Sequence, residues 1–221
     1  MASDPAEQVL LYGYWRSSSA YRVRIALNLK QISYRQEPVH LVRDGGEQNA
    51  AAYRDVNPLG LVPALVHRGR TVVQSIAICE YLEETFGDNP LLPSDPVSRA
   101  RVRSIAQSIA CEIQPFNNLS VLKYLEQELG QDSSGIDHWY AHWIRRGFSA
   151  VETWLSDADS GSYCHGDRPT LADCFLVPQV YNAERFSCDL EPYPNIRRIA
   201  ARCRSLPAFE RAAPENQPDA P

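Results

Sequence analysis

The sequence predicts an α/β domain followed by an all-helical domain, and three observations lead to this fold class. β-prone apolar runs alternate with amphipathic helical segments over residues 8–87. Three prolines then fall within residues 88–96, where no helix interior or central strand would tolerate them. Every long segment after residue 96 has apolar residues at helical spacing. We therefore predict a domain at 8–87, a linker at 88–96, a helical domain at 97–213 and a flexible tail at 214–221.

The first domain is expected to have the element order βαβαββα. Its strands are expected at residues 9–14, 33–41, 64–67 and 71–73, and its helices at 18–30, 48–55 and 76–85. Arg68-Gly69-Arg70 is the glycine-containing turn that joins the last two strands into a hairpin. Ser75 is expected to cap the closing helix with its hydroxyl.

The second domain is predicted to consist of helices alone, at residues 97–130, 136–158, 171–186 and 196–206. Thr170 and Asp173 stand three residues apart directly after a proline, a spacing typical of a capping box at the start of a buried helix. Four aromatic residues are expected to build the helical core or a dimer surface, or alternatively a hydrophobic ligand wall: Trp139, Tyr140, Trp143 and Phe148.

Composition argues against several classes of protein. The chain has 221 residues, of which 44% are hydrophobic and 22% charged, so it can bury a substantial core. The formal net charge is −5 with Lys and Arg scattered along the chain, which argues against a general binder of nucleic acid or anionic membranes. Small anionic ligands are compatible with this charge, because a few local arginines suffice to bind them.

Cysteine usage and the first residues of the chain favour a cytosolic protein with reduced thiols. Residues 1–5 show no charged-then-apolar leader, and no apolar run approaches about eighteen residues. The six cysteines are widely spaced without a Cys-x-x-Cys pair, so we interpret all six as buried structural residues. No metal site is expected, since His138 and His142 lie four residues apart on a predicted helix but lack a third ligand.

Ser17, Ser18 and Ser19 stand where the first strand leads into the first helix. The first N–H groups of a helix have no internal acceptor and carry the positive end of its dipole, so they can hold a thiolate or carboxylate together with a serine hydroxyl. None of these hydroxyls is a strong nucleophile by itself. We infer that a reactive group would arrive with a small molecule; the alternative is that Ser17 is only a helix cap.

Two further positions suit a peptide-like ligand. Val62-Pro63 precedes the first hairpin strand, where thioredoxin-like folds carry a cis proline that leaves the preceding backbone free to pair with an extended peptide. Gln74-Ser75 opens another helix and offers an amide and a hydroxyl beside a second set of N–H groups, which suits a carboxylate. An ordinary trans turn at Pro63 and a simple cap at Ser75 are the structural alternatives.

The chain resembles the zeta class of the glutathione S-transferase family over nearly its whole length. Residues 17–27 read Ser-Ser-Ser-Ala-Tyr-Arg-Val-Arg-Ile-Ala-Leu, which is similar to the class signature Ser-Ser-Cys-x-x-Arg-Val-Arg-Ile-Ala-Leu. Further stretches that resemble the class occur in order at residues 57–58, 61–63, 74–75, 80–84, 113–115, 117–122, 176–180, 182–186 and 189–194. The resemblance implies a thioredoxin-like first domain, a helical second domain and a homodimer.

The resemblance also implies glutathione as the cofactor. Ser17 would hydrogen-bond the glutathione sulfur, with Ser18 and Ser19 beside it. Ionising a thiol of pKa about 8.5 at neutral pH takes about 2.7 kcal/mol, which a charge-assisted hydrogen bond of roughly 1.5–3 kcal/mol and a helix end of about 0.3–1 kcal/mol can supply. Four residues match the remaining contacts: Gln74 and Ser75 to the γ-glutamyl end, the Val62 backbone to the cysteinyl part and Gln48 to the glycine end.

The activity implied by the resemblance is the cis–trans isomerisation of a maleyl compound. The glutathione thiolate adds to the cis double bond, the new single bond rotates, and elimination gives the fumaryl product and returns glutathione. Because such a substrate carries carboxylates, Arg16 and Arg185 match the family's candidates for planar clamps. Gln114 and Asn118, on the first helix after the linker, would add amide donors to the binding site.

Two departures from the family patterns refine this expectation. Residues 114–120 read Gln-Pro-Phe-Asn-Asn-Leu-Ser, whereas the maleylpyruvate-type pattern is His-Pro-x-Asn-Asn-Arg-Arg, which favours maleylacetoacetate. The resemblance itself implies a place in tyrosine and phenylalanine breakdown. Ser19 replaces the signature cysteine, so we expect no chemistry that needs a protein thiol, while isomerisation survives. The alternatives are a maleylpyruvate isomerase, a general conjugating transferase or peroxidase, and a non-catalytic glutathione-binding module.

Overall fold

The computed structural model describes residues 7–221 and divides into two compact units. The first unit combines the chain up to Leu91 with the segment Leu206–Pro221, and the second unit is Leu92–Ser205. The last residues of the chain therefore pack with the α/β part, which differs from the boundaries expected at 97–213 and 214–221. The expectation about residues 1–5 lies outside the described residues.

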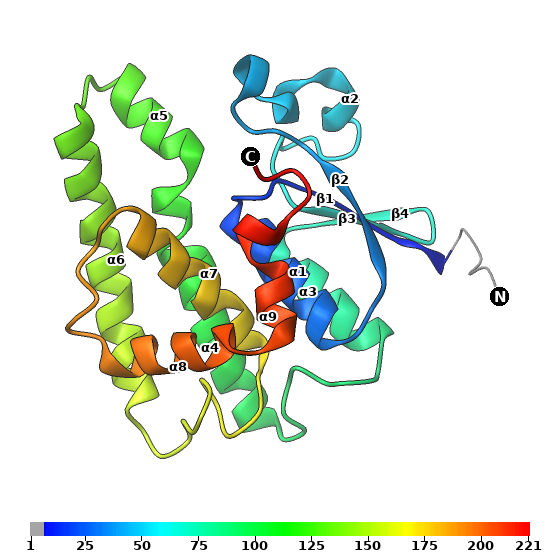
Figure 1. Ribbon diagram of the computed structural model, residues 1–221, viewed down its shortest axis with the longest axis vertical. Coiled ribbons are helices and arrows are strands. Elements are labelled where there is room, and N and C mark those ends of the chain that lie inside the picture. The colour runs from blue at the N-terminus through cyan, green and yellow to red at the C-terminus, as the bar shows by residue number, and fades with distance from the viewer. Residues whose placement is uncertain (1–6) are drawn as a thin grey trace. The chain divides into compact units, whose positions relative to one another are not determined.

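Four strands form the sheet of the first unit in the order β2-β1-β3-β4 (Figure 1): β1 (Val9–Gly13), β2 (Tyr34–Pro38), β3 (Ala64–His67) and β4 (Arg70–Val73). β1 pairs in parallel with β2 and antiparallel with β3, which pairs antiparallel with β4. The parallel pair needs a long crossover, and α1 (Ser18–Leu29) supplies it. Along these elements the predicted order βαβαββα is confirmed.

The hairpin of β3 and β4 closes with a two-residue loop. His67 pairs with Arg70, which leaves Arg68 and Gly69 as the loop, at φ values of 51° and 67°. Two consecutive positive φ values are typical of a type I′ turn, whose twist matches that of the flanking strands. The second strand therefore begins at Arg70, one residue earlier than the sequence pattern predicts.

α1 packs against α3 (Ser75–Thr85) and α9 (Pro207–Ala212) within the first unit (Figure 1). Short helical turns at Arg43–Gly45 and Glu47–Asn49, followed by α2 (Ala51–Arg54), lead from β2 towards β3. α1 buries charged side chains as well as apolar ones, since Arg22 and Arg24 are each only 1% exposed. Buried charges at this depth require polar partners, and those partners shape the candidate site.

The last residues of the chain are packed, although their polar, proline-rich composition predicts fraying. The buried side chain of Gln217 donates hydrogen bonds to the carbonyls of Arg211 and Ala213, at 2.9 and 2.7 Å. Its Oε1 accepts a hydrogen bond of 2.9 Å from Nε2 of Gln36, on β2. The flexible tail expected at 214–221 is thus corrected to an ordered segment, which begins with a 3-10 turn at Pro214–Asn216.

Five helices form the second unit: α4 (Pro96–Glu112), α5 (Leu119–Gln127), α6 (Ser133–Leu155), α7 (Leu171–Arg185) and α8 (Pro194–Arg204). α7 is buried along most of its length and packs against α4 and α8. The capping box predicted at its start is confirmed, because Asp173 Oδ2 accepts a hydrogen bond of 2.7 Å from the Thr170 N–H. Burial raises the pKa of the Asp173 carboxyl, and the hydrogen bonds that the carboxylate accepts counteract this rise.

The single helix expected at 97–130 is interrupted. α4 ends at Glu112, a 3-10 turn follows at Pro115–Asn117, and α5 begins after Asn118. Pro115 cannot donate the backbone hydrogen bond that a continuing helix needs, and the Asn118 side chain accepts from the Ser120 N–H at 3.0 Å, which caps a new helix. Gln114 and Asn118, two of the residues predicted for the site, flank this short turn and do not lie on the helix expected to carry them.

Candidate active site

Ser17 stands at the N-terminus of α1, where its hydroxyl accepts a hydrogen bond of 3.2 Å from the Ala20 N–H. It is therefore the helix cap that one alternative predicts. A hydroxyl that accepts in this way still has its own proton to donate to an anion. Ser18 and Ser19 occupy the first turn, where an α-helix has no internal acceptor for the N–H groups. Capping and anion binding are thus compatible at this position.

A buried arginine fixes the loop that leads to Ser17. Arg24 donates from Nη2 to the carbonyl of Trp15 at 2.9 Å and from Nη1 to the carbonyl of Tyr14 at 3.4 Å. Burial lowers the pKa of Arg24 to about 10, so the guanidinium is still protonated at neutral pH. No role was expected for Arg24 from the sequence, although it is a charged residue among the apolar residues of a buried helix.

The Val62–Pro63 peptide bond is cis, as the thioredoxin-like pattern predicts. Two side chains fix the peptide group before it, because Tyr53 Oη and Asn57 Nδ2 each donate to the carbonyl of Leu61 at 2.7 Å. Asn57 is 2% exposed, so this contact is shielded from water. Neither Tyr53 nor Asn57 was singled out as a positioning residue from the sequence.

Gln74 and Ser75 differ from the expectation. Gln74, not Ser75, is the cap residue of α3, and it has an exposed side chain and a φ of 71°. Ser75 is the first residue of the helix, and its buried hydroxyl accepts a hydrogen bond of 3.2 Å from Arg22 Nη1. A positive φ at a residue other than glycine costs free energy, and such residues concentrate at functional sites. The prediction that Ser75 caps α3 is wrong, because Gln74 occupies the cap position. The positive φ of Gln74 makes this residue a candidate ligand contact.

Gln48 lies in the turn Glu47–Asn49 and is half-buried. Its Nε2 donates to the carbonyl of Leu41 at 3.4 Å, while its buried Oε1 has no hydrogen-bond partner among the described residues. A buried amide oxygen normally has a donor. A ligand N–H would satisfy it, so this side chain fits the glycine end of a peptide-like cofactor.

Strand register brings these positions to one end of the sheet. Tyr12 of β1 pairs with Ala64 of β3, and Ala64 pairs with Val73 of β4. Ser17 follows the end of β1, Val62 precedes the start of β3 and Gln74 follows the end of β4, so all three lie at the same end of the sheet. Gly13 of β1 also pairs with Pro38 of β2, so the segment that carries Gln48 leaves the sheet from that end. The first unit therefore gathers hydroxyl, amide and backbone groups suited to glutathione.

Arg16 lies in the loop before Ser17 and is half-buried. Its guanidinium carbon lies 5.3 Å from the centre of the Trp15 ring, within the range of a cation–π contact. A guanidinium that lies over an aromatic ring keeps its hydrogen-bond donors at its own edge, where they can reach a carboxylate.

Gln114, Asn118 and Arg185 belong to the second unit. The turn that carries the two amides is tied to α6, since Asn117 Nδ2 donates to the carbonyl of Tyr140 at 3.3 Å. The Tyr140 ring stacks on Phe186, with ring centres 3.7 Å apart, directly after the exposed Arg185 at the end of α7. The turn and the end of α7 thus both pack against Tyr140.

The cysteines separate into two groups. Four of them are buried as expected: Cys79, Cys164, Cys174 and Cys203. Cys111 is exposed and Cys188 is half-buried, which corrects the expectation that all six are buried. Burial raises the pKa of the Cys79 thiol to about 12 and that of Cys188 to about 11, so neither is a thiolate at neutral pH.

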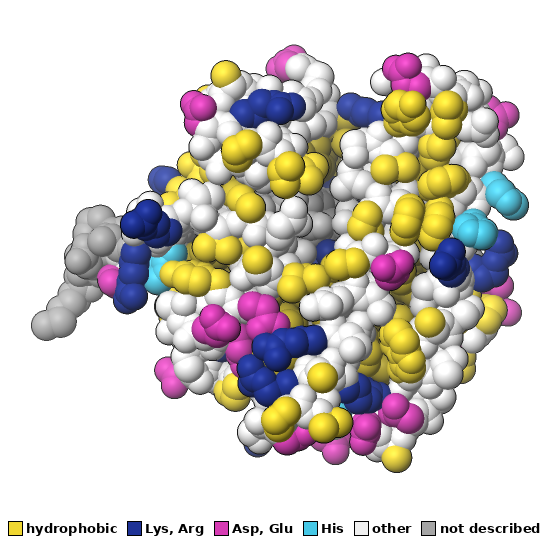
Figure 2. Space-filling model, turned by 180° about the vertical axis from the view of Figure 1, so that it is seen from behind, with side chains coloured by type: hydrophobic (Ala, Val, Ile, Leu, Met, Phe, Trp, Pro, Cys, Tyr) yellow, Lys and Arg dark blue, Asp and Glu magenta, His cyan; other side chains and the backbone are white. Residues whose placement is uncertain are grey.

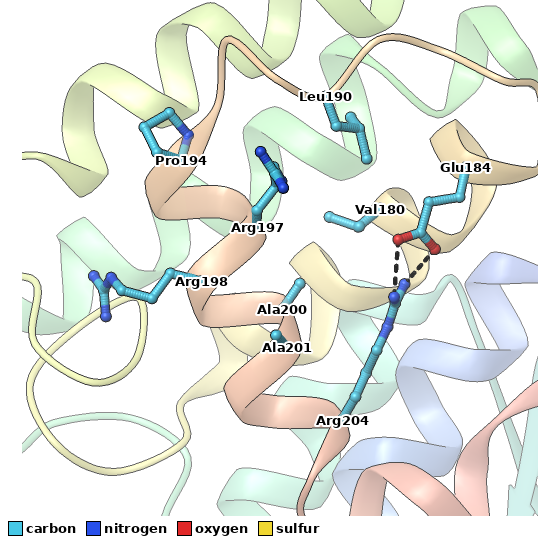
Figure 3. Close-up of a pocket in the computed structure, with 9 residues that line it drawn as sticks. All are labelled: Val180, Glu184, Leu190, Pro194, Arg197, Arg198, Ala200, Ala201 and Arg204. Atoms are coloured by element: carbon cyan, nitrogen blue, oxygen red, sulfur yellow. Dashed lines mark hydrogen bonds and ion pairs between the residues drawn. The ribbon is translucent and has the colours of Figure 1, made fainter.

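A cavity of about 460 Å³ opens between α7 and α8 in the second unit (Figure 3). Glu184 and Arg204 face each other across it in a two-point ion pair, with N–O distances of 2.9 and 2.7 Å. None of the residues predicted for the site lines this cavity.

Further observations concern surface charge, membrane spans and metal ligands in the part of the chain that the structure describes. On the face shown in Figure 2, basic side chains lie in separate groups with acidic ones among them. Within residues 7–221, no helix is long and apolar enough to cross a membrane, and no cluster of three or more His, Cys, Asp or Glu side chains could hold a metal ion. His138 and His142 are both exposed on α6.

Comparison with known proteins relates this geometry to a family. Residues 16–85 match the model of the glutathione S-transferase N-terminal domain, and residues 137–202 match that of the C-terminal domain. A probable maleylacetoacetate isomerase from Vibrio cholerae is 51% identical over 212 residues, covering 96% of this chain and 98% of the relative.

Two solved structures are similar along their whole length. One is a holo maleylpyruvate isomerase described as a bacterial zeta-class glutathione S-transferase, with a TM-score of 0.93 and 47% identity over 96% of this chain and all of the other. The second is a Methylobacterium extorquens maleylacetoacetate isomerase with bound malonate and glutathione, with a TM-score of 0.91 and 38% identity over 96% of this chain and 99% of the other.

Proposed function

The chain belongs to the zeta class of the glutathione S-transferase family, and on that premise we propose that it isomerises maleylacetoacetate to fumarylacetoacetate with glutathione as cofactor. The observation that carries the proposal is the set of ligand groups at one end of the sheet, where Ser17, Val62 and Gln74 emerge together. These ligand groups are a hydroxyl, an amide and backbone groups, and the proposed reaction requires no protein thiolate.

Bound glutathione supplies the thiolate that adds to the cis double bond and departs after the bond has rotated. Ser17 donates its hydroxyl proton towards that sulfur while its oxygen still accepts from the Ala20 N–H. The N-terminus of α1 adds a positive potential at the same point. Together these stabilise the ionised sulfur by roughly 2–4 kcal/mol, enough to lower a thiol pKa by about two units.

Six other residues are assigned to holding the cofactor. Gln74 and Ser75 hold the γ-glutamyl end, where the exposed amide of Gln74 and the first turn of α3 face a carboxylate. Val62 offers backbone groups to the cysteinyl part, and Gln48 accepts from an N–H at the glycine end. Ser18 and Ser19 contribute first-turn N–H groups beside the sulfur.

The maleyl substrate is a dianion at neutral pH, so its recognition is assigned to cations and amide donors. Arg16 and Arg185 would bind its carboxylates as planar, two-point donors, and Gln114 and Asn118 would add amide N–H groups. Asn118 uses its carbonyl oxygen to cap α5, which leaves its NH₂ group as the donor. Such donors also stabilise the negative charge that develops next to the double bond when sulfur adds.

Maleylpyruvate is the second candidate substrate, because the zeta-class structure with a TM-score of 0.93 is a maleylpyruvate isomerase. Leu119 and Ser120 stand where the maleylpyruvate-type pattern has two arginines, which favours maleylacetoacetate. Steady-state kinetics on both substrates, side by side, will decide. A higher kcat/KM for maleylpyruvate would overturn the assignment.

The cofactor role is tested with maleylacetone and purified protein, with and without glutathione. We expect isomerisation only with glutathione, and no net loss of glutathione over many turnovers. Equal rates in both mixtures would refute the cofactor role. Stoichiometric consumption of glutathione would instead indicate a conjugating transferase or peroxidase, and an absence of glutathione binding in calorimetry would contradict both readings.

We further propose that the protein is a cytosolic homodimer acting in tyrosine and phenylalanine breakdown. Its support is the family resemblance and the six free cysteines among the described residues, as expected in a reducing compartment. Light scattering should give a mass of twice 24.9 kDa. A monomer mass at micromolar concentration would contradict the dimer.

A further inference from the structure

The backbone of Trp15 is held at both its N–H and its carbonyl group. Its N–H donates to Asp219 Oδ2 at 2.9 Å, and its carbonyl accepts from Arg24 Nη2 at 2.9 Å. Arg24 also donates from Nε to the carbonyl of Ala212 at 3.0 Å. The loop before Ser17 is therefore fastened on one side to α1 and on the other to the last residues of the chain.

Asp219 is presented by an anchored segment. Gln217, 6% exposed, is bound to Gln36 of β2 and to two carbonyls of its own segment. Upstream, Asn28 of α1 donates from Nδ2 to the carbonyl of Ala208 at 2.9 Å. Because these bonds hold the segment in place, the Asp219 carboxylate can fix a distant loop.

The position of Trp15 bears directly on two residues assigned to the reaction. The Ser17 N–H donates to the carbonyl of Tyr14 at 3.0 Å, so the four residues from Tyr14 to Ser17 form one tight turn. The Arg16 guanidinium stacks over the Trp15 ring. A displacement of Trp15 therefore moves both the hydroxyl meant for sulfur and the cation meant for substrate.

We propose that Asp219 is a positioning residue of the isomerase: together with Arg24 it clamps the Trp15 backbone and so sets where Ser17 and Arg16 meet their ligands. The inference rests on the proposed function, since it concerns the geometry of that site. It predicts that the site depends on a hydrogen-bond acceptor that lies 204 residues away in sequence from the loop it holds.

The test compares Asp219→Ala with Glu215→Ala. Each variant removes one acidic group from the same segment, but only the first removes the acceptor of the Trp15 N–H. We expect kcat of Asp219→Ala to fall roughly tenfold to a hundredfold, because a misplacement of reacting groups by about 1 Å can cost about a hundredfold in rate. The pH titration of the bound glutathione thiolate, followed by its ultraviolet absorption, should move to higher pH, with an unfolding temperature close to that of Glu215→Ala.

Asp219→Asn tests the clamp by rescue, since it retains one acceptor oxygen and should recover most of the kcat. If Asp219→Ala does not fold, a chain without residues 219–221 is compared with one without 220–221, and only the first should show the loss. Equal kcat and equal thiolate titration in Asp219→Ala and Glu215→Ala would overturn the clamp. A wild-type protein inactive on maleyl substrates would refute the proposed function alone, and the thiolate titration would still decide on the clamp.

Discussion

The starts of α1 and α3 lie at the same end of the sheet but are built in opposite ways. At α1 the cap residue Ser17 has an ordinary extended φ of −69°, and its side chain satisfies a backbone N–H. At α3 the cap residue Gln74 has a φ of 71° and makes no capping hydrogen bond, while the hydroxyl of Ser75 is held by Arg22. One helix start is relaxed and the other is strained.

In the proposed function, the two helix starts divide the work of binding between them. A relaxed, capped start holds a hydroxyl at a fixed point, which suits a single atom such as sulfur. A strained start keeps a long side chain exposed at the helix end, which suits the charged end of a flexible ligand. We therefore expect changes at α1 to affect the rate and changes at α3 to affect affinity.

The largest effect is expected from Ser17→Ala. Losing the hydrogen bond to sulfur should lower kcat by roughly tenfold to a hundredfold, from about 1.5–3 kcal/mol of charge-assisted bonding, while glutathione binding is partly retained. Ser17→Gly is the matched variant, because glycine is a tolerated cap but also lacks the hydroxyl. Both variants should lose activity alike. In urea unfolding, Ser17→Ala should be less stable than the wild type by about 1 kcal/mol. Full activity in either variant would contradict the role of Ser17.

Gln74→Ala and Gln74→Gly come next and act on affinity. Both remove the amide and should weaken glutathione binding by roughly tenfold in calorimetry, with kcat at saturating glutathione within about twofold of the wild type. Only glycine relieves the positive φ, so Gln74→Gly should be more stable than Gln74→Ala by about 1 kcal/mol. Equal stabilities would show that the strained start is not a property of this residue in solution.

Ser75→Ala should have a smaller effect, divided between stability and affinity. It removes the acceptor of the Arg22 hydrogen bond inside the first unit, so we expect a loss of about 1 kcal/mol of unfolding free energy and a few-fold rise in KM for glutathione. Ser149→Ala, which removes an exposed hydroxyl on α6, is the control and should change neither quantity. A stability unchanged in both variants would show that the Arg22 contact contributes nothing measurable.

Ser19→Cys should have the smallest effect on isomerisation. It restores the residue of the class signature, and we expect kcat and KM on the maleyl substrate to stay within about twofold, because the sulfur that reacts belongs to the cofactor. The variant should gain the ability to form a mixed disulfide with oxidised glutathione, detected by mass spectrometry. A large gain in isomerase rate would show that α1 needs a thiol as well as a hydroxyl.

Local patterns predicted the strands, most of the helices and the backbone features at which the proposed site residues lie. The strand-to-helix change at Ser17, the cis proline at 63 and the Thr170–Asp173 box are encoded within a few residues of sequence, and each was found as expected. The missed features depend on distant partners. Sequence alone predicts that the Ser75 hydroxyl caps α3, but the hydroxyl binds Arg22 instead. The polar composition of the last residues predicts fraying, but hydrogen bonds to Gln36 and Trp15 hold them in place.

The contact between Arg16 and Trp15 provides the molecule with an optical reporter. The sequence has four tryptophans, and the other three, at positions 139, 143 and 154, all belong to the second unit. Replacing those three with phenylalanine would leave Trp15 as the one tryptophan. Its ring lies under the Arg16 guanidinium, and its backbone is hydrogen-bonded to Asp219 and Arg24. Its emission spectrum would then record the state of the loop before Ser17 during catalysis, without any added label.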